Sequence, residues 1–500
     1  MTAYSELEAR FRRMSALGEA AGVLHWDRAV LMPEGGAGAR SDQLAALAMT
    51  RHEMITDDRL PDLLDDAAYD VADDPWRSAN LNEMRRDHIH ASAVPADLVE
   101  ALSTEGLACE MLWREARADN DFPLVAPKLA EVLALVRQSA DAKADALGLS
   151  PYEALMDQYE PGARVAHIDA LFAELADFLP DFIEAVLVHQ GKRVEPLPLG
   201  GPFPIEAQRA LGVRLMERLG FDFDRGRLDI SLHPFCGGVP GDIRITTRYA
   251  KDDFTQGLMG VLHETGHALY EMGLPADWRH QPVGGARGMA LHESQSLLIE
   301  MQACRSREFI EFAAPLMRDA FLGDSGDGGA AWSVDNLYRH YTRVARSLIR
   351  VDADEVTYPA HVILRYRLER ALIAGDMKVD DIPGAWNDAM QDLLHITPPG
   401  DADGCLQDIH WYDGTFGYFP TYTLGAIAAA QLFDAAHGAD PGIPRAISNG
   451  DFAPLVGWMG EHIHGRASFA STDQLIADAT GAPLGIDAFR RHLTARYLAD

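Results

Sequence analysis

The chain of 500 residues has few cysteines and few basic side chains. Its four cysteines (Cys109, Cys236, Cys304 and Cys405) lie far apart and form no CxxC pair, which argues against a cysteine-based metal site. We expect reduced, structural thiols in a cytoplasmic protein. The 44 Lys and Arg against 76 Asp and Glu give a net charge of -32. This charge argues against nucleic acid and anionic membranes as partners, because both require a basic surface.

Long apolar runs, repeats and obvious linkers are also missing from the sequence. No run of 18 or more apolar residues occurs, so we expect no membrane span. The N-terminal stretch MTAYSELEARFRRM is charged and has no apolar core, so we do not expect a signal peptide. No internal repeat or biased tract marks a domain boundary. We therefore predict one domain over residues 1–500, which can contain two lobes around a groove.

Apolar residues with helical spacing make up most of what the sequence does contain. The first such helix ends at the glycine-rich stretch LMPEGGAGARS, in which Ser41 is a plausible cap for the next helix. The same pattern predicts helices at 97–118, 124–146, 165–190, 205–219, 254–272, 286–322, 334–351, 355–374, 382–394 and 421–436. The predicted fold class is therefore mainly α.

One region, RLDISLHPFCGGVPGDIRITTRY (227–249), has a different pattern. Ile230 and Leu232 alternate with polar residues before a Gly/Pro-rich turn, and Ile243 and Ile245 alternate after it, which predicts a strand, a loop and a second strand. We expect a small antiparallel sheet at this point, directly before the next helix. Such a sheet edge can hold a peptide by strand addition.

That next helix contains VLHETGHALYE (261–271), with two histidines four residues apart. On a helix, His263 and His267 project from one face and can bind a single zinc ion, with Glu264 beside them. Zinc lowers the pKa of a bound water, and the glutamate can act as the general base on that water. An HExxH pattern arises by chance in about 4% of chains of this length, so it needs a third ligand to carry weight.

The best source of a third ligand is the predicted helical stretch LHESQSLLIE (291–300). Glu293 precedes two leucines that can bury one face of the helix and turn its carboxylate inward. His292 and Glu300 are competing candidates. Glu300 lies two turns further on, where it can also pair with a basic residue or support a ligand. On spacing alone, the alternative to a ligand role for Glu293 is a simple surface or helix-capping carboxylate.

The motifs now assembled resemble the carboxypeptidase Taq family of zinc metallocarboxypeptidases, peptidase family M32. The resemblance extends over about residues 4–497 and includes, besides HETGH, the ordered motifs HWDRAVLMPEGGAGAR (25–40), HPF (233–235), DIRIT (242–246), HESQS (292–296), IRVDAD (349–354) and GCLQDIHW (404–411). It implies a helical, saddle-like body with a deep groove, a small sheet beside the metal helix, and a homodimer. It also implies broad removal of C-terminal residues, with poor action at proline.

Residue by residue, the resemblance implies zinc ligands at His263, His267 and Glu293 and a general base at Glu264. The residues alone do not select the metal, because the same ligands also bind cobalt or manganese. An exopeptidase must also recognise a free carboxylate, which suits the fork of an arginine. Arg350 is the first candidate, which the resemblance supports.

Arg244 in DIRIT is the second candidate for the carboxylate. Asp352 and Asp354 could orient Arg350; alternatively, Arg350 and Asp354 form only a structural ion pair between helices.

Three further residues are candidates for contacts with the substrate. His410 and Tyr422 can polarise the scissile carbonyl or stabilise the oxyanion, and Tyr422 lies in a Gly/aromatic loop that can close over substrate. His233 can form part of the groove wall. For each residue the alternative is a side chain with only a structural role.

The leading hypothesis is a zinc carboxypeptidase that acts on peptides with a free C-terminus. A second is a zinc oligopeptidase that cuts internal bonds of short peptides, which the HExxH helix does not distinguish. A third is a catalytically silent helical scaffold that binds peptides. The intact ligand set and Glu264 argue against the third hypothesis.

Overall fold

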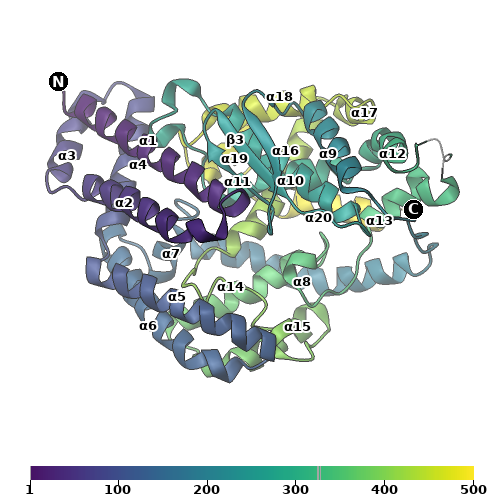
Figure 1. The fold of residues 1–500 in the computed structure, drawn as a ribbon, viewed down its shortest axis with the longest axis horizontal. Helices are drawn as coiled ribbons and strands as arrows, with labels where there is room; N and C mark the ends of the chain where they lie inside the picture. Colours follow the sequence, from purple (N-terminus) through teal and green to yellow (C-terminus); the bar gives the residue numbers. More distant parts are fainter. Residues whose placement is uncertain (1, 324–325, 327, 500) are drawn as a thin grey trace.

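The computed structural model describes residues 2–323, 326 and 328–499 and has a mainly α fold (Figure 1). Its N-terminal half comprises α1 (Ala3–Val30), α2 (Ala37–Ile55), α3 (Leu60–Asp70), α4 (Pro75–Ser92), α5 (Ala96–Asp119), α6 (Phe122–Leu147), α7 (Pro151–Met156), α8 (Val165–Gln190) and α9 (Ile205–Leu219). The helix predicted to start near Ser41 instead starts at Ala37, with Gly36 as its N-cap.

A small sheet and the remaining helices follow. The strands are β1 (Gly226–Ile230), β2 (Phe235–Val239) and β3 (Asp242–Thr247). The helices are α10 (Thr255–Gly273), α11 (Met289–Leu297), the π-helix η4 (Leu298–Cys304), α12 (Arg307–Phe321), α13 (Val334–Tyr341), α14 (Tyr358–Ala374), α15 (Ile382–Leu394), α16 (Pro420–Ala439), α17 (Ile443–Ser448), α18 (Ala453–His462), α19 (Thr472–Thr480) and α20 (Asp487–Tyr497). None of the helices in the described part of the chain is long and apolar enough to cross a membrane.

The sheet is mixed, so the prediction of an antiparallel sheet was wrong in part. Its strand order is β1-β3-β2, with β1 parallel and β2 antiparallel to β3. The stretch expected to be a loop forms β2, where Gly238 has a φ of 89° that β-branched residues do not tolerate. Ile243 and Ile245 of β3 belong to a buried apolar cluster with Val261 of α10, which attaches the sheet to the predicted metal helix.

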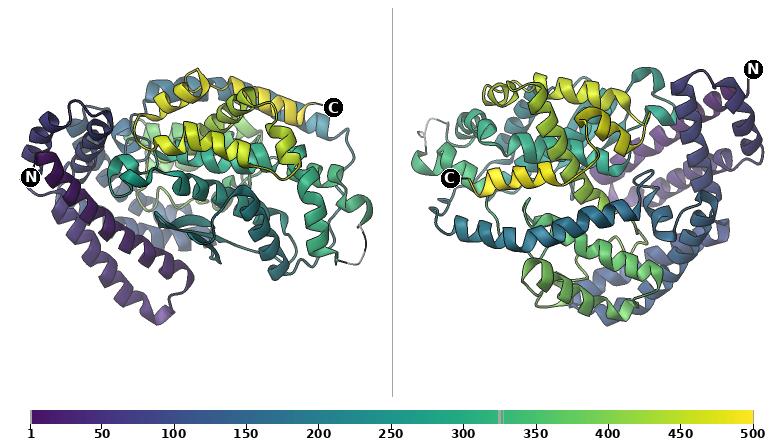
Figure 2. Two further views of the ribbon diagram at one scale, coloured as in Figure 1. Left: turned by 90° about the horizontal axis from the view of Figure 1, so that it is seen from above. Right: turned by 180° about the vertical axis from the view of Figure 1, so that it is seen from behind.

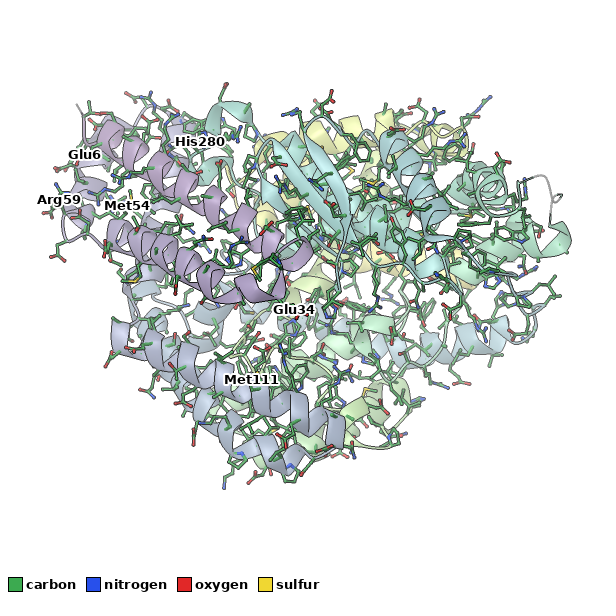
Figure 3. All side chains as sticks on the ribbon, in the orientation of Figure 1. Glu6, Glu34, Met54, Arg59, Met111 and His280 are labelled. Carbon is green, nitrogen blue, oxygen red and sulfur yellow. The ribbon has the colours of Figure 1, made fainter. Side chains whose placement is uncertain are left out.

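Figure 2 shows the long α1–α2 pair projecting to one side of the body. Figure 3 marks the turn between these helices with Glu34, and marks α5, which is drawn below that turn, with Met111. Tyr4, Leu7 and Phe11 of α1 form a small core of their own with α3 and α4, apart from the main core. The prediction of one domain with two possible lobes stays a prediction.

Two long predicted helices are interrupted in the structure. The segment 286–322 becomes α11, the π-helix η4 and α12, and α12 begins after Ser306, whose Oγ accepts a hydrogen bond from the backbone N–H of Phe309. The segment 334–351 is helical only as far as Tyr341, apart from a short 3-10 turn at Arg350–Asp352. The helices expected at 165–190 and 205–219 match α8 and α9.

Candidate active site

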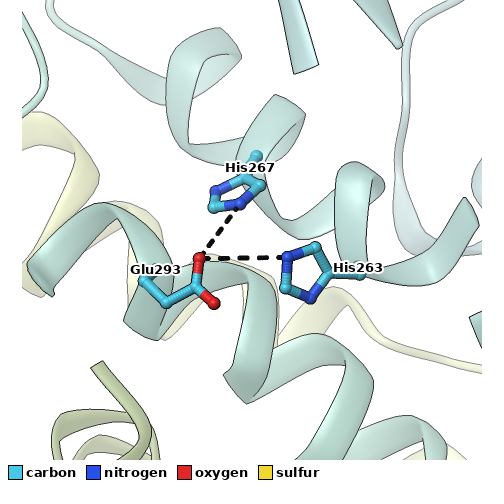
Figure 4. A group of neighbouring side chains, drawn as sticks. All are labelled: His263, His267 and Glu293. Carbon is cyan, nitrogen blue, oxygen red and sulfur yellow. Dashed lines mark ion pairs between the residues drawn. The ribbon is translucent and has the colours of Figure 1, made fainter. Parts of the chain in front are cut away.

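His263 and His267 lie on one face of α10, and Glu293 of α11 faces both imidazole rings (Figure 4). The Nε2 atoms of His263 and His267 are 3.9 and 3.5 Å from the Oε2 atom of Glu293, and the three candidate ligand atoms all lie within 4.8 Å of one another. Tetrahedral zinc separates adjacent N and O ligands by about 3.3 Å. The cluster therefore fits a divalent metal ion after only small side-chain adjustments.

Two glycines allow the helices to approach closely enough to place Glu293. A Cβ atom on Gly266 of α10 would lie 2.6 Å from the carbonyl oxygen of Gln295, so α10 and α11 cross in near backbone contact. A Cβ atom on Gly425 of α16 would lie 2.8 Å from the Cβ and Cγ atoms of Glu293. Glu293 is thus held between α10 on one side and α16 on the other.

The Nδ1 atoms of both histidines have acceptors that leave Nε2 facing Glu293. The Nδ1 atom of His263 lies 2.9 Å from Oε2 of Glu300, whose other oxygen is 2.7 Å from Arg305. The Nδ1 atom of His267 lies 3.1 Å from the backbone oxygen of His292. Such acceptors hold a metal-binding imidazole in the tautomer with a free Nε2. Glu300 therefore makes both of the contacts considered for it from the sequence: it supports a candidate ligand, His263, and it pairs with a basic residue, Arg305.

His292, the other competitor for the third ligand, is turned away from the Nε2 side. Its Nδ1 atom is 2.7 Å from Nδ1 of His267, and its Nε2 atom is 2.9 Å from Glu271. It therefore lies behind His267, between that ring and a carboxylate one turn further along α10.

Glu264 is a buried carboxylate, with 7% of its surface exposed. No other described residue forms a hydrogen bond or ion pair with its side chain, which is rare for a buried charge. Burial, followed by the charges of Glu293 and Glu300, raises its pKa to about 7, although the charge of His263 opposes this. A carboxylate with these properties can accept and return a proton near neutral pH.

Opposite charges offset the burial of the candidate ligands. Burial opposes the ionisation of Glu293, but the charge of His263 and the hydrogen bond to His267 outweigh it and lower the pKa of Glu293 to about 2. Burial also opposes a charge on His263, but Glu293 and Glu300 raise its pKa to about 10. Burial and the neighbouring His292 lower the pKa of His267 to about 4, so this ring is neutral at pH 7.

Arg350 is buried among three aromatic side chains, Tyr358, Phe419 and Tyr422, which we call the aromatic surround. Its guanidinium carbon lies 4.9 Å from the ring centre of Tyr422 and 5.6 Å from that of Phe419, and NH1 donates to the Tyr358 hydroxyl at 2.9 Å. Burial raises the pKa of Tyr358 and of Tyr422, and the charge of Glu293 adds to this effect, so both hydroxyls are within electrostatic reach of a candidate metal ligand.

The acidic partner of Arg350 is Asp408, and not the residues expected from the sequence. NH2 of Arg350 donates to Asp408 at 2.8 Å. Asp352 is exposed, and its side chain makes no hydrogen bond with the described residues, while Asp354 accepts from the backbone N–H groups of Val356 and two other residues. The suggested orienting role of Asp352 and Asp354, and the alternative Arg350–Asp354 ion pair, were therefore both wrong.

His410 and Tyr422 lie in the same surround. The His410 ring centre is 4.4 Å from that of Phe419 and 6.4 Å from that of Tyr422. Burial and the charges of Arg350 and Arg365 lower the pKa of His410 to about 4, despite the opposing charge of Asp408. The Nδ1 atom of His410 is buried and has no hydrogen-bond partner among the described residues. This ring is therefore neutral at pH 7, and its buried Nδ1 atom is available for a hydrogen bond.

Comparison with known proteins agrees with this geometry. The family model of the carboxypeptidase Taq (M32) metallopeptidases matches residues 6–497. The chain belongs to this family. Thermostable carboxypeptidase 1 of Thermus thermophilus is 37% identical over 99% of this chain and 98% of its own length. Carboxypeptidase 1 of Bacillus subtilis is 32% identical over 97% and 96%.

Solved structures of M32 carboxypeptidases share the fold. Metallocarboxypeptidase 1 of Trypanosoma cruzi superimposes with a TM-score of 0.96 at 39% identity, over 99% of each chain. An M32 carboxypeptidase of Deinococcus radiodurans superimposes with a TM-score of 0.93 at 35% identity, over 99% of this chain and 98% of its own. The protein is thus a peptide hydrolase of the metallocarboxypeptidase type, and its family implies a divalent metal ion and peptide substrates.

Two of the predicted substrate-binding residues of this M32 chain lie apart from the cluster. Arg244 forms an ion pair with Asp242 at 2.5 Å and stacks over Trp26 of α1 at 4.5 Å, on the sheet face opposite the isoleucines that pack on α10. His233 is exposed just before β2. The alternative of a buried core histidine was therefore wrong, and a place in the groove wall stays a prediction.

Sequence reasoning missed three residues that the structure places at this M32 site: Asp408, Arg365 and Tyr358. Asp408 stands within the quoted GCLQDIHW motif, two residues before His410, so a signal for it was present. Arg365 and Tyr358 lie on α14 with no motif of their own. The Arg365 guanidinium is fully buried and lies 2.6 Å from Asp408, a contact that only the fold reveals.

Proposed function

We propose that the protein is a zinc carboxypeptidase of broad specificity, with zinc held by His263, His267 and Glu293. The observation that carries the proposal is the placement of three candidate ligand atoms, one each from His263, His267 and Glu293, within 4.8 Å of one another. Glu264, whose buried side chain has no hydrogen-bond partner among the described residues, follows His263 on the same helix. Three protein ligands leave a fourth position for water or substrate, as in catalytic zinc sites. Cobalt or manganese suits the same ligands, so the metal is a separate question for experiment.

The chain's own groups supply the rest of the proposed mechanism. A bound divalent ion would lower the pKa of water and polarise the scissile carbonyl. Glu264 would accept a proton from the attacking water at a carboxylate oxygen and then deliver it to the leaving amine. Arg350 would bind the terminal carboxylate of the substrate. His410 and Tyr422 would donate hydrogen bonds to the carbonyl oxygen as its negative charge develops.

The oligomeric state, location and partners of the enzyme are supported less directly. We propose a homodimer, which the family resemblance supports, and a cytoplasmic location, which the sparse and unpaired cysteines support. Sedimentation equilibrium that gives the mass of one chain would contradict the dimer. The net charge of -32 argues against nucleic acid and anionic membranes as partners, and the family supports peptides as substrates.

A time course of products from one unblocked peptide tests the activity. We expect stepwise loss of C-terminal residues, abolished by a chelator and restored by added zinc, with cobalt and manganese compared in parallel. The same peptide with an amidated C-terminus should be cleaved much more slowly, because Arg350 loses its charged partner. Internal cleavage at the same rate for both peptides would contradict the carboxypeptidase proposal and support an oligopeptidase.

A further inference from the structure

A buried cluster of two arginines and one aspartate lies beside the aromatic surround. Asp408 accepts from Nε and NH2 of Arg350, at 3.3 and 2.8 Å through Oδ1. Its Oδ2 atom accepts from Nε of Arg365 at 2.7 Å. The side chains of Arg350 and Arg365 are 7% and 0% exposed, and that of Asp408 is 12% exposed. One carboxylate therefore joins two guanidinium groups that are almost completely removed from water.

The charges in this cluster do not balance. Burial lowers the pKa of Arg365 to about 10, which still leaves it charged at pH 7, whereas the two arginines hold the pKa of Asp408 well below its usual range although burial opposes this. Two positive charges and one negative charge leave one positive charge. Another buried carboxylate, Glu369, does not contact either arginine of this cluster, because its oxygens accept hydrogen bonds from Tyr152, Trp411 and the backbone of Gly417.

The hydrogen bonds of Arg350 also leave a defined part of its guanidinium free. Arginine carries five N–H groups. Asp408 takes the pair on the Nε and NH2 edge, and Tyr358 takes one on NH1. One N–H remains on each terminal nitrogen, and a pair of N–H groups on the two terminal nitrogens can bind a carboxylate through two parallel hydrogen bonds, as an end-on fork.

Aromatic rings hold both guanidinium groups in place. The Arg365 carbon lies 4.4 Å from the ring centre of Trp386 and 5.4 Å from that of Phe419, and Phe419 also contacts Arg350. NH1 of Arg365 donates to the backbone oxygen of His361 at 2.7 Å. Arg365 is therefore fixed by α14 itself, and it in turn fixes Asp408.

We propose that Asp408 and Arg365 are positioning residues for recognition of the substrate's terminal carboxylate. Asp408 holds Arg350 with its end-on fork free, and Arg365 keeps the cluster positive, so that the peptide carboxylate is the missing counter-charge. The inference rests on the proposed carboxypeptidase function, in which Arg350 binds that carboxylate.

The first test removes the positive charge at Arg365. The dissociation constant of the peptide Ala-Ala-Ala-Leu and of its C-terminal amide is measured by calorimetry with metal-loaded protein in a Glu264→Gln background. We expect Arg365→Gln to weaken binding of the free acid by about 10-fold to 100-fold and binding of the amide by far less. In steady-state kinetics of otherwise wild-type protein, KM for the acid should rise more than kcat falls. Arg365→Lys, which keeps the charge, should recover most of the loss.

Asp408→Asn is an independent test, because it changes the affinity for the acid in two opposite ways. It adds one net positive charge, which favours the acid, but it releases the Arg350 fork, which disfavours it. Under the proposal, binding of the acid weakens by about tenfold despite the added charge. Unchanged or tighter binding of the acid would overturn the positioning role of Asp408, and an unchanged preference for acid over amide in Arg365→Gln would overturn that of Arg365.

A matched control separates positioning from general stability. Asp157 is another poorly exposed carboxylate held by two basic side chains, Arg86 and His90, both of which lie on α4. Asp157→Asn should lower the unfolding temperature without changing the preference for acid over amide. A change in that preference as large as in Asp408→Asn would count against the proposal. If wild-type protein itself does not distinguish acid from amide, the proposed function fails, and this inference fails with it; a preference in wild type that both variants keep overturns the inference alone.

Discussion

Glu264 occupies a position in which a buried carboxylate would ordinarily be paired. The charges of His263, Glu293 and Glu300 act on it, and none of the described residues forms a hydrogen bond or ion pair with its side chain. A structural glutamate in such a place would cost free energy without a partner. The free-energy cost of this burial is offset only if a ligand or water supplies a hydrogen-bond partner for Glu264 during the reaction.

Replacement of Glu264 by Gln should separate metal binding from turnover. We expect kcat to fall by at least about 100-fold, because the amide cannot accept the proton from water. Metal content, measured by elemental analysis after dialysis, should stay stoichiometric, since the three candidate ligands are unchanged. A variant that keeps appreciable activity, or one that loses its metal, would contradict the assigned role.

At the scale of the element, close helix packing decides where Glu293 lies. Gly266 and Gly425 allow α10 and α16 to approach α11 from two sides. The sequence motif identified Glu293, but spacing alone left it open as a surface residue, since nothing local shows that α16 covers its helix. The distance between residues 293 and 425 in the chain explains why the fold was needed.

Gly425→Ala tests this packing. The new methyl group would lie 2.8 Å from Glu293, so we expect a loss of about 1–3 kcal/mol in the free energy of unfolding and weaker metal binding. Gly438→Ala in the same helix has no heavy atom within 4 Å of its methyl group and should be neutral or gain up to about 1 kcal/mol. Urea unfolding and metal titration compare the two variants. Equal behaviour of both would show that the α11–α16 contact is not limiting.

The two interrupted helices show which local predictions required the fold. Apolar periodicity continues past Tyr341, yet the N–H of Val344 is bonded by the Gln190 side chain and that of Ala345 by Asp354. These distant side chains replace helical hydrogen bonds, and no local pattern announces them. By contrast, α8 and α9 matched their predicted ranges because their apolar faces pack continuously on the main core.

At the scale of the whole molecule, the C-terminal helix is attached to the body by a buried ionic cluster. Glu355, 4% exposed, accepts from His492 at 2.7 Å, Arg496 at 3.0 Å and the Tyr497 hydroxyl at 2.9 Å, all on α20. Burial opposes its ionisation, but His492 and Arg496 hold its pKa well below the usual range. Arg496 also donates to the backbone of Gln302 in the π-helix that carries Glu300.

Glu355→Gln should lower the free energy of unfolding at pH 7 by about 3–5 kcal/mol, because it leaves a buried arginine without its counter-charge. A depressed folded-state pKa stabilises the protein above the unfolded value of about 4.3, and this contribution is lost as the pH falls. The difference between wild type and variant should therefore shrink below about pH 4. Asp434→Asn, which removes the exposed pair with Arg491 of the same helix, should cost at most about 1 kcal/mol. Urea unfolding at several pH values compares them, and equal losses would contradict the cluster's role.

The whole-molecule predictions from sequence succeeded where they rested on ordered motifs and composition. Family, helical class and the position of the sheet beside α10 were predicted, whereas the parallel pairing of β1 with β3 was not. After β1 the chain forms the outer strand β2 from the glycine-rich FCGGV, and only then returns to form β3 in the middle of the sheet. No local sequence pattern indicates that path.

The π-helix Leu298–Cys304 sets the rotational phase between two parts of the molecule. In an uninterrupted α-helix each residue advances by 100°, so α11 and α12 would present their apolar faces in one fixed phase. The wider coil and the break at Ser306 shift that phase, so α11 packs on α10 and α16 while α12 packs on α9, α13 and α17. Removing a single residue here would turn the part of the helix that follows it, as far as the break at Ser306, by about 100°. The length of this short segment is therefore as constrained as the identity of the ligands that precede it.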